Sequence, residues 1–464
     1  MSIINNKLHY WFLNIALILG LILIIFGPPM TIPDEQAHFL NAYSIADGQI
    51  ILKNENGNIG KYFPENIVKF ANDNFDKYVG LDSEKYKFKE YYYNSYLPNS
   101  VEQKEIFYSY FNQDITPIAY IFSSLGIFVG KLLLPSSYEL PFNLLIFART
   151  FNFVFYIISI FYAIKITPYY KNTMFMLALM PMSIYLGASI SYDCLLIPST
   201  FLLVAQILKI RNQKEIYISD IVRIFFLIFM LSCLKKSAYL PFVLVLFSIP
   251  IKMFDNSKKY CKIICLATII AIIGIIIGRV NSIIGNGFIV NDNKIELQKQ
   301  YLESNLGLMI PLIRNSFIKY KLFYFTSFIG VLGQLDTNFP LVLLLIFALI
   351  LIYTIIMDGI ECKLIIRKFK VFTIISIIVF IYFTFRSMYI NWTPLVEDMY
   401  GNFVSGIQGR YFIPLSMFAA VLFSTNAIKV KNNKLANINE IISIYSIIIM
   451  SVIMVITLIT RYWI

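Results

Sequence analysis

Long apolar runs, separated by short polar stretches, recur along this sequence from its beginning to its end. Each run holds roughly 17 to 25 residues, the length at which a helix crosses about 30 Å of hydrocarbon. We therefore predict an all-α polytopic membrane protein with about eleven transmembrane helices plus juxtamembrane helices. The predicted spans are residues 10–27, 142–164, 172–190, 194–210, 219–234, 237–251, 262–279, 340–357, 370–387, 411–427 and 440–459.

The first apolar run follows a short basic start and ends in Gly27-Pro28-Pro29, without a small-x-small cleavage site. It is typical of an uncleaved signal anchor. The five cysteines lie inside or beside apolar runs, and their spacing is not that of a zinc or redox site. A disulfide framework is therefore not expected.

Composition agrees with a membrane environment. Hydrophobic residues make up 58% of the chain and charged residues 14%, against about 25% charged residues in soluble domains. A net charge of +12 would suggest nucleic-acid binding in a soluble protein. Here the excess of Lys and Arg lies in short loops between spans, as expected for cytoplasmic loops. We expect the lipid bilayer as a partner and no nucleic acid.

The basic loops predict the topology. Five of them should be cytoplasmic: those holding Lys165 and Lys171; Lys209, Arg211 and Lys214; Lys252, Lys258, Lys259 and Lys262; Lys363, Arg367, Lys368 and Lys370; and Lys429, Lys431 and Lys434. If the apolar stretch 116–134 also crossed the membrane, every one of these loops would move outside. We predict instead that it lies in the interface or re-enters, in keeping with Pro117, Gly126 and Gly130. The N-terminus is then inside and the C-terminus outside a bacterial cytoplasmic membrane.

Five segments follow from this topology. They are a signal-anchor span (1–27), a large outer loop with juxtamembrane helices (28–141), a transmembrane core (142–279), a second outer loop (280–339), and C-terminal transmembrane helices with a further outer loop (340–464). The first outer loop is rich in Tyr, Asn and Lys, and we expect it to form a small lid of amphipathic helices at the headgroup level.

The sharpest local feature is Pro33-Asp34-Glu35-Gln36-Ala37-His38, just beyond the outer end of the first span. A carboxylate here could be a general base that removes a proton from an attacking hydroxyl. Alternatively, Asp34 only caps a helix that starts after it. His38 shares a helical face with Asp34 and Glu35 and could help to bind a divalent metal, although hydrogen bonding is favoured and the sequence requires no metal.

Further polar clusters sit in apolar surroundings, where a charge costs roughly 2.5 to 3.5 kcal/mol on insertion scales. The topology places them near the outer ends of spans. Snorkelling lysines and interhelical ion pairs are the alternative explanation. Together the clusters suggest an outer cavity in which cations hold a phosphate-bearing substrate. The candidate substrate-binding residues are His38, Arg149, Asp193, Lys236, Asp336, Gln408, Arg410 and Tyr411.

An ordered set of motifs supports this interpretation. The set is Pro28-Pro29 with Pro33-Asp34-Glu35 and His38, Arg149 with Asn152, Ser189 to Asp193, Lys236 to Pro241, Gly333 to Thr337, and Gln408 to Tyr411. In these motifs the chain resembles a large bacterial family of multispanning membrane proteins. That family in turn is similar to membrane glycosyltransferases of the C-type fold (GT-C).

The resemblance implies a catalytic acidic residue in the first outer loop, a polyprenyl phosphate sugar as donor, and a juxtamembrane helix over 116–134. Asp34 or Glu35 would be that catalytic residue. Asp193 stands without an acidic neighbour, a departure from the resembled enzymes that leaves a metal site open.

The predicted function is that of an inverting glycosyltransferase. It would move a sugar from an undecaprenyl phosphate donor to a cell-surface glycan, teichoic acid or lipid-linked acceptor on the extracytoplasmic face. Asp34 would deprotonate the acceptor hydroxyl, Glu35 would assist, and Arg410 with Lys236 and Arg149 would hold the leaving phosphate. Two alternatives stay open: a transporter or flippase of lipid-linked glycans, and a glycan polymerase or ligase.

Overall fold

The structure is a computed structural model that describes residues 7–55, 58–80, 84–87, 104–109, 116–134, 140–254, 256–281, 293–305, 307–362, 367–424 and 433–464. Within these ranges the side chains of residues 236, 361, 433 and 434 are not described.

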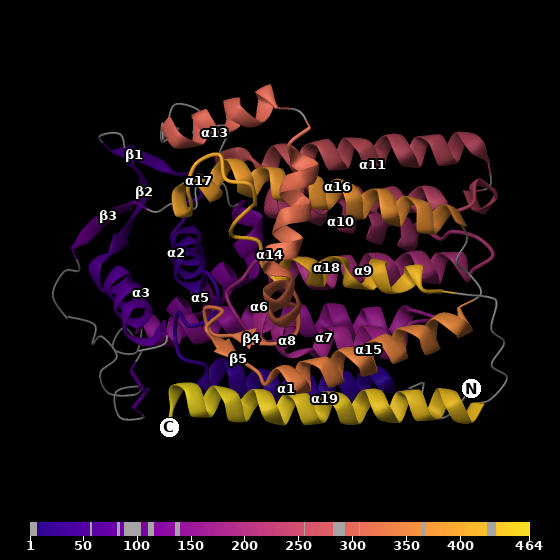
Figure 1. The fold of residues 1–464 in the computed structure, drawn as a ribbon, viewed down its shortest axis with the longest axis horizontal. Helices are drawn as coiled ribbons and strands as arrows, with labels where there is room; N and C mark the ends of the chain where they lie inside the picture. Colours follow the sequence, from indigo (N-terminus) through magenta and orange to yellow (C-terminus); the bar gives the residue numbers. More distant parts are fainter. Residues whose placement is uncertain are drawn as a thin grey trace.

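Long apolar helices form a bundle and lie side by side in Figure 1. Among the described residues, seven helices are long and apolar enough to cross a membrane. They are α1 (Leu8–Phe26), α6 (Pro141–Ile166), α9 (Asp193–Arg211), α11 (Ser257–Gly278), α15 (Leu341–Glu361), α16 (Arg367–Asn391) and α19 (Asn433–Tyr462). The chain is thus a multispanning helical membrane protein, as the apolar pattern predicts.

The other predicted spans form shorter elements, so the predicted number of about eleven is not confirmed. They correspond to α7 (Lys171–Leu179) with α8 (Pro181–Gly187), α10 (Ile218–Cys233), the 3-10 helix η4 (Leu240–Ser248) between η3 (Leu234–Ser237) and η5 (Ile251–Phe254), and α18 (Ile413–Leu422) after η7 (Gly409–Phe412). Pro181 explains one interruption. A proline disfavours helical geometry at the preceding residue, and Met180 is accordingly extended, at ψ 139.

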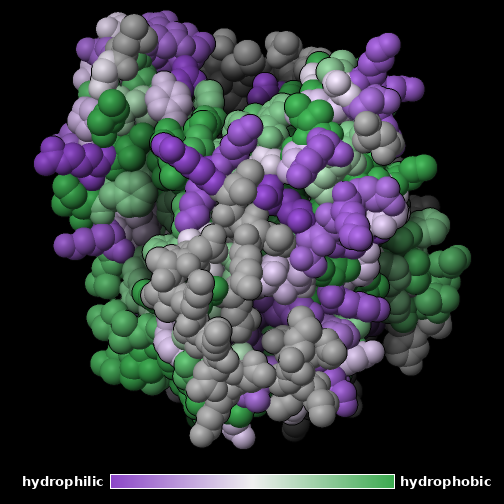
Figure 2. Space-filling model, turned by 90° about the vertical axis from the view of Figure 1, so that its right-hand side faces the viewer, coloured by the Kyte–Doolittle hydropathy of each residue, from purple (hydrophilic) through white to green (hydrophobic). Residues whose placement is uncertain are grey.

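The helix ends that flank the predicted basic loops lie at one end of the bundle, whereas Lys363, Lys429 and Lys431 themselves lie outside the described residues. The ends of α6, α9 and α15 and the starts of α7, α11 and α16 meet there, near the start of α1, whereas α19 ends at the opposite side (Figure 1). Figure 2 shows this end face, on which hydrophilic residues cluster between hydrophobic margins. We call it the basic end. The arrangement agrees with the expectation that these loops lie on the same side of the membrane.

The opposite end carries the lid. It contains α2 (Glu35–Ala46), α3 (Glu65–Tyr78) and an antiparallel three-stranded sheet of β1 (Lys53–Glu55), β2 (Asn58–Pro64) and β3 (Glu105–Ser109). Tyr62 pairs with Phe107 across β2 and β3, and their rings contact at 5.4 Å between centroids. The expectation of a purely helical lid is therefore wrong. Cross-strand aromatic pairs of this kind stabilise a sheet.

Residues 116–134 form η1 (Pro117–Tyr120) and α5 (Ile121–Leu133). With 13 residues, α5 is about 20 Å long and too short to cross a bilayer by itself. It runs antiparallel to α6, since the ring of Phe122 stacks on Phe155 while Gly130 lies against Leu144. Its place relative to a bilayer stays a prediction.

The second predicted outer loop contains α13 (Asn293–Ser304), α14 (Met309–Ile329), and a hairpin of β4 (Val331–Leu332) and β5 (Thr337–Asn338). In Figure 1, α14 runs across the long helices instead of along them. The last outer segment contains α17 (Thr393–Val396) and leads into η7.

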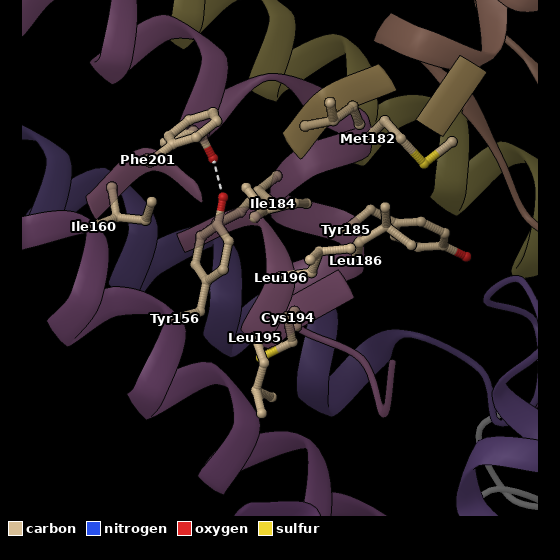
Figure 3. Close-up of a cluster of buried hydrophobic side chains, with 14 of the residues drawn as sticks. Tyr156, Ile160, Met182, Ile184, Tyr185, Leu186, Cys194, Leu195, Leu196 and Phe201 are labelled. Atoms are coloured by element: carbon tan, nitrogen blue, oxygen red, sulfur yellow. Dashed lines mark hydrogen bonds between the residues drawn. The ribbon is translucent and has the colours of Figure 1, made fainter. Parts of the chain in front are cut away.

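Part of the hydrophobic core lies between α6, α8 and α9. Figure 3 shows how buried side chains of these helices, among them Tyr156, Ile184 and Leu195, come together. The Tyr156 hydroxyl donates to the Ala178 carbonyl at 2.7 Å. This packing fixes the turn between α8 and α9, where Asp193 begins a helix.

Candidate functional site

The loop between α1 and α2 holds Asp34 in an unusual conformation. Asp34 has a φ of 64°, and Met30 a φ of 61°. Such left-handed backbone is uncommon outside glycine and persists only where the surroundings enforce it. Gln334 does so here: its amide nitrogen donates to the carbonyls of Met30 (2.9 Å) and Ile32 (2.6 Å), and its oxygen accepts the Asp34 N–H at 3.2 Å.

Glu35 anchors the loop to the bundle. Its carboxylate forms a two-point pair with Arg149, at 2.8 Å from Nε to Oε1 and 2.5 Å from Nη2 to Oε2, and both side chains are fully buried. Arg149 also donates to the carbonyls of Gly27 and Pro28, and the Met30 N–H donates to Glu35. With its oxygens occupied in this way, Glu35 is better suited to positioning the loop than to the chemistry expected of it.

The Asp34 side chain points toward Arg410, whereas that of Glu35 points toward Arg149. It precedes α2 but makes no side-chain cap hydrogen bond, so helix capping does not account for its carboxylate. That carboxylate pairs instead with the Arg410 guanidinium, and the side chain is 46% exposed. Desolvation raises the pKa of the Asp34 carboxyl, but the charge of Arg410 outweighs it, and the pKa lies below its ordinary value. Asp34 is therefore ionised at neutral pH and can accept a proton.

Arg410 lies fully buried in η7, between two carboxylates. Nη2 contacts Asp34, Nη1 is 3.5 Å from Asp193 Oδ2, and Nε donates to the Gln408 side chain. A close backbone approach sets this position. The Gly409 N–H donates to Ser327 Oγ of α14 at 2.8 Å, and a Cβ on Gly409 would lie 2.1 Å from the Tyr324 carbonyl oxygen.

Lys235 reaches the same site from η3. Its Nζ lies 3.3 Å from the centroid of the Tyr411 ring and within 6 Å of the Tyr192 and Tyr239 rings. Such a cage attracts a cation. The backbone φ of Lys235 is 44°, another enforced conformation. Burial lowers the pKa of the Lys235 ammonium to about 7.

His38 completes the site on the lid side. Its Nδ1 shares a 2.7 Å hydrogen bond with the Tyr120 hydroxyl of η1, and its ring meets Tyr192 edge-on. Burial lowers the pKa of the His38 imidazole to about 4, so the ring is neutral at pH 7. Its Nε2 has no hydrogen-bond partner among the described residues.

Several buried polar atoms around this site lack hydrogen-bond partners within the described part of the chain. They are His38 Nε2, Asn152 Oδ1, both Asp193 carboxylate oxygens, Lys235 Nζ and Arg410 Nη1. Buried polar groups normally find partners, and leaving them unpaired costs free energy. These atoms include hydrogen-bond acceptors, such as the Asp193 oxygens, and donors on Lys235 and Arg410. Such a set could bind a ligand that carries both hydroxyl groups and negative charge.

Asp336, another predicted site residue, has different neighbours. It accepts hydrogen bonds from the Gly80 N–H and the Thr337 hydroxyl and lies 3.5 Å from Arg461, so it connects the lid to the end of α19. The side chain of Lys236 lies outside the described residues. No group of three or more His, Cys, Asp or Glu residues in the described ranges could hold a metal ion.

Lys235 and Gln334 are not among the candidate substrate-binding residues predicted from the sequence, although Lys235 adjoins Lys236 in a polar cluster. The path of η3 brings the Lys235 side chain to the three tyrosine rings. Tyr239, four residues after Lys235, is the signal that could have favoured Lys235. Gln334 lies within the motif 333–337, but its contacts with the Asp34 loop span about 300 residues of chain.

The family described as "Predicted membrane protein (DUF2142)" matches residues 17–419, which cover most of the chain and every residue of this site. No curated protein and no solved structure matches the chain.

Proposed function

Since the chain belongs to the family described as predicted membrane protein (DUF2142), we propose an enzymatic role for the shared site: an inverting, GT-C-like glycosyltransferase. Its donor is a sugar linked to a polyprenyl phosphate, and its acceptor is a hydroxyl of a cell-surface glycan, teichoic acid or lipid-linked glycan. One observation carries the proposal. The half-exposed Asp34 carboxylate pairs with the buried Arg410 guanidinium, and Arg410 Nη1 and Lys235 Nζ have no hydrogen-bond partner among the described residues.

These residues suit the proton and the developing negative charge that the reaction must handle. The acceptor oxygen bonds to the anomeric carbon from the face opposite the phosphate, and its proton passes to Asp34. The bond between that carbon and the phosphate oxygen breaks, and its electron pair leaves with the phosphate. Arg410 and Lys235 stabilise the charge that develops there. His38, with its free Nε2, is placed to orient an acceptor hydroxyl.

Arg410 links the two halves of the site. Without substrate, its charge lowers the pKa of Asp34, which makes the carboxylate a weak base. A phosphate that draws on the same guanidinium weakens this effect, because the added negative charge favours a protonated neighbour. Asp34 therefore gains basicity when the donor is bound, which favours binding of the donor before proton removal.

The location of the site supports an extracytoplasmic reaction at the cytoplasmic membrane. Asp34, Lys235 and Arg410 follow α1 and α10 and precede α18, at helix ends remote from the basic end (Figure 1). Basic loops favour the cytoplasmic side. Nucleotide sugars are not available outside the cell, so a lipid phosphate is a suitable carrier of activated sugar.

A flippase or transporter is the second candidate, because buried polar residues also occur toward the basic end. Asp358 of α15 accepts four hydrogen bonds, from Asn172, Asn439 and the backbone and side chain of Thr173. A translocation path would need open polar groups through the depth of the membrane. The saturated Asp358 carboxylate is better suited to joining α7, α15 and α19.

The decisive experiment compares wild type with Asp34→Asn in purified transfer assays with polyprenyl phosphate sugars. A general base contributes roughly a factor of 100 to 10,000, so Asp34→Asn should bind donor and transfer almost nothing. Asp73→Asn, on α3, is the matched control, because its carboxylate lies outside this set of contacts. Undiminished transfer by Asp34→Asn would reject the base. Lipid flipping without any transfer by wild type would favour the second candidate.

A further inference from the structure

Without a bound ligand, Lys235 is close to the balance between its neutral and its charged form at neutral pH. Its Nζ is buried and has no hydrogen-bond partner among the described residues. The charged or titratable groups that face it come from the loop before α2, from α2, from the start of α9, from the residue before η4, and from η7: Asp34, His38, Tyr192, Asp193, Tyr239, Arg410 and Tyr411.

These neighbours nearly cancel one another. Arg410 is permanently charged and pairs with both Asp34 and Asp193. One cation therefore faces two carboxylates, and a charged Lys235 makes the set neutral. Desolvation opposes that charge and holds the pKa of the Lys235 ammonium at about 7. A small change in nearby charge is enough to decide the protonation state at physiological pH.

A phosphate supplies such a change. It brings one or two negative charges to the cations, and a negative neighbour favours the protonated lysine. We propose that Lys235 takes up a proton from the solvent when a phosphate group occupies this site and returns it when the phosphate leaves. The inference rests on the proposed function only in placing a phosphate beside Arg410 and Lys235, and it requires no sugar transfer.

The pH dependence has a definite sign. With a resting pKa of about 7, Lys235 is mostly neutral at pH 8 and mostly charged at pH 6. Binding at pH 8 should therefore take up most of a proton at this residue, and binding at pH 6 much less. A phosphate monoester has its second pKa near 6, so at pH 8 it is already a dianion and adds little to the proton balance.

The experiment is isothermal titration of the full-length protein in detergent with farnesyl phosphate at pH 8. It is run in two buffers of different ionisation enthalpy, so that the difference in heat gives the number of protons taken up. Farnesol controls for binding of the isoprenyl chain. Lys235→Arg keeps a positive charge but cannot titrate, so it should bind farnesyl phosphate with uptake close to zero. Lys252→Arg, at the exposed end of η5, should keep the wild-type uptake.

The outcomes separate the two proposals. Phosphate-dependent binding without proton uptake by wild type, or with full uptake by Lys235→Arg, would overturn the role of Lys235 and leave the proposed function standing. Equal binding of farnesol and farnesyl phosphate would overturn both. If Lys235→Arg does not fold, the wild-type protein alone tests the proposal. Proton uptake on farnesyl phosphate binding that does not rise between pH 6 and pH 8 would reject it.

Discussion

Gln334 lies 300 residues after Asp34 in the chain, yet its side-chain oxygen accepts the Asp34 backbone N–H at 3.2 Å. The same amide donates to two carbonyls of the loop. We therefore expect Gln334→Leu to release Asp34 from its left-handed conformation. Transfer should fall by about 100-fold, as for loss of a well-placed base, while affinity for polyprenyl phosphate changes little. Kinetics with Gln300→Leu, an exposed glutamine of α13, as control would test this, and unchanged kcat in Gln334→Leu would contradict it.

The Glu35–Arg149 pair predicts a stability effect. Breaking a buried pair by removing one partner costs about 3–5 kcal/mol, since the remaining charge is left uncompensated. Glu35→Leu and Arg149→Met should each lower thermal stability strongly, and the double variant should lose less than the sum. A strictly additive double variant would show that the two side chains act independently.

Tyr120→Phe tests the role of His38. Removal of the hydroxyl takes away the hydrogen-bond partner of His38 Nδ1, so the imidazole is no longer held in one tautomer. Contacts of the sugar donor with Arg410 should stay intact. We expect KM for the acceptor to rise several-fold with little change in donor affinity. Tyr108→Phe, which removes a hydroxyl from the lid sheet, is the comparison. A rise confined to donor KM would assign His38 to the donor instead.

Gly409→Ala should displace the Arg410 loop. The new Cβ would meet the backbone of Tyr324 and Phe328, and overpacking of this kind costs about 1–3 kcal/mol. Because Arg410 shifts with the loop, affinity for the sugar donor should fall by more than the fraction of protein lost to unfolding explains. The melting temperature measures that loss of stability. Gly307→Ala, where a Cβ meets no atom within 4 Å, should leave both properties near wild type. Normal donor binding by Gly409→Ala would argue against the need for this close approach.

Asp358→Leu should destabilise the protein without affecting the site. The change leaves the donors of Asn172, Thr173 and Asn439 unpaired, and each costs about 1–3 kcal/mol when buried. Phosphate binding by the folded fraction should be unchanged. If Asp358→Leu instead melts normally but abolishes lipid movement, Asp358 belongs to a translocation path.

The seven long apolar helices among the described residues are readable from the sequence because their length and composition follow from burial in hydrocarbon, whereas the shorter elements were predicted as full spans. The lid sheet was missed because β2 and β3 are short and about 40 residues apart, so no local pattern pairs them. Within the site, Asp34, Glu35, Arg149 and Arg410 stand out as charges beside apolar runs. The partner of each charge cannot be predicted in the same way. The two-point contact of Glu35 with Arg149, for example, depends on the turn before α2. For Lys235, burial depends on the path of η3, which no local pattern in the sequence reveals.

The separation of Asp34 and Arg410 also bears on biosynthesis. Their side chains meet across 376 residues, whereas Glu35 and Arg149 are 114 residues apart. Chains emerge from the ribosome at about 5–20 residues per second, so the Glu35–Arg149 pair can form many seconds before Arg410 is made. During that interval the amino-terminal half can assemble around its buried pair while the Asp34 carboxylate has no cation. A nascent chain is thus without Arg410 until η7 has been inserted, and translation arrest before that point would leave the Asp34–Arg410 pair unformed.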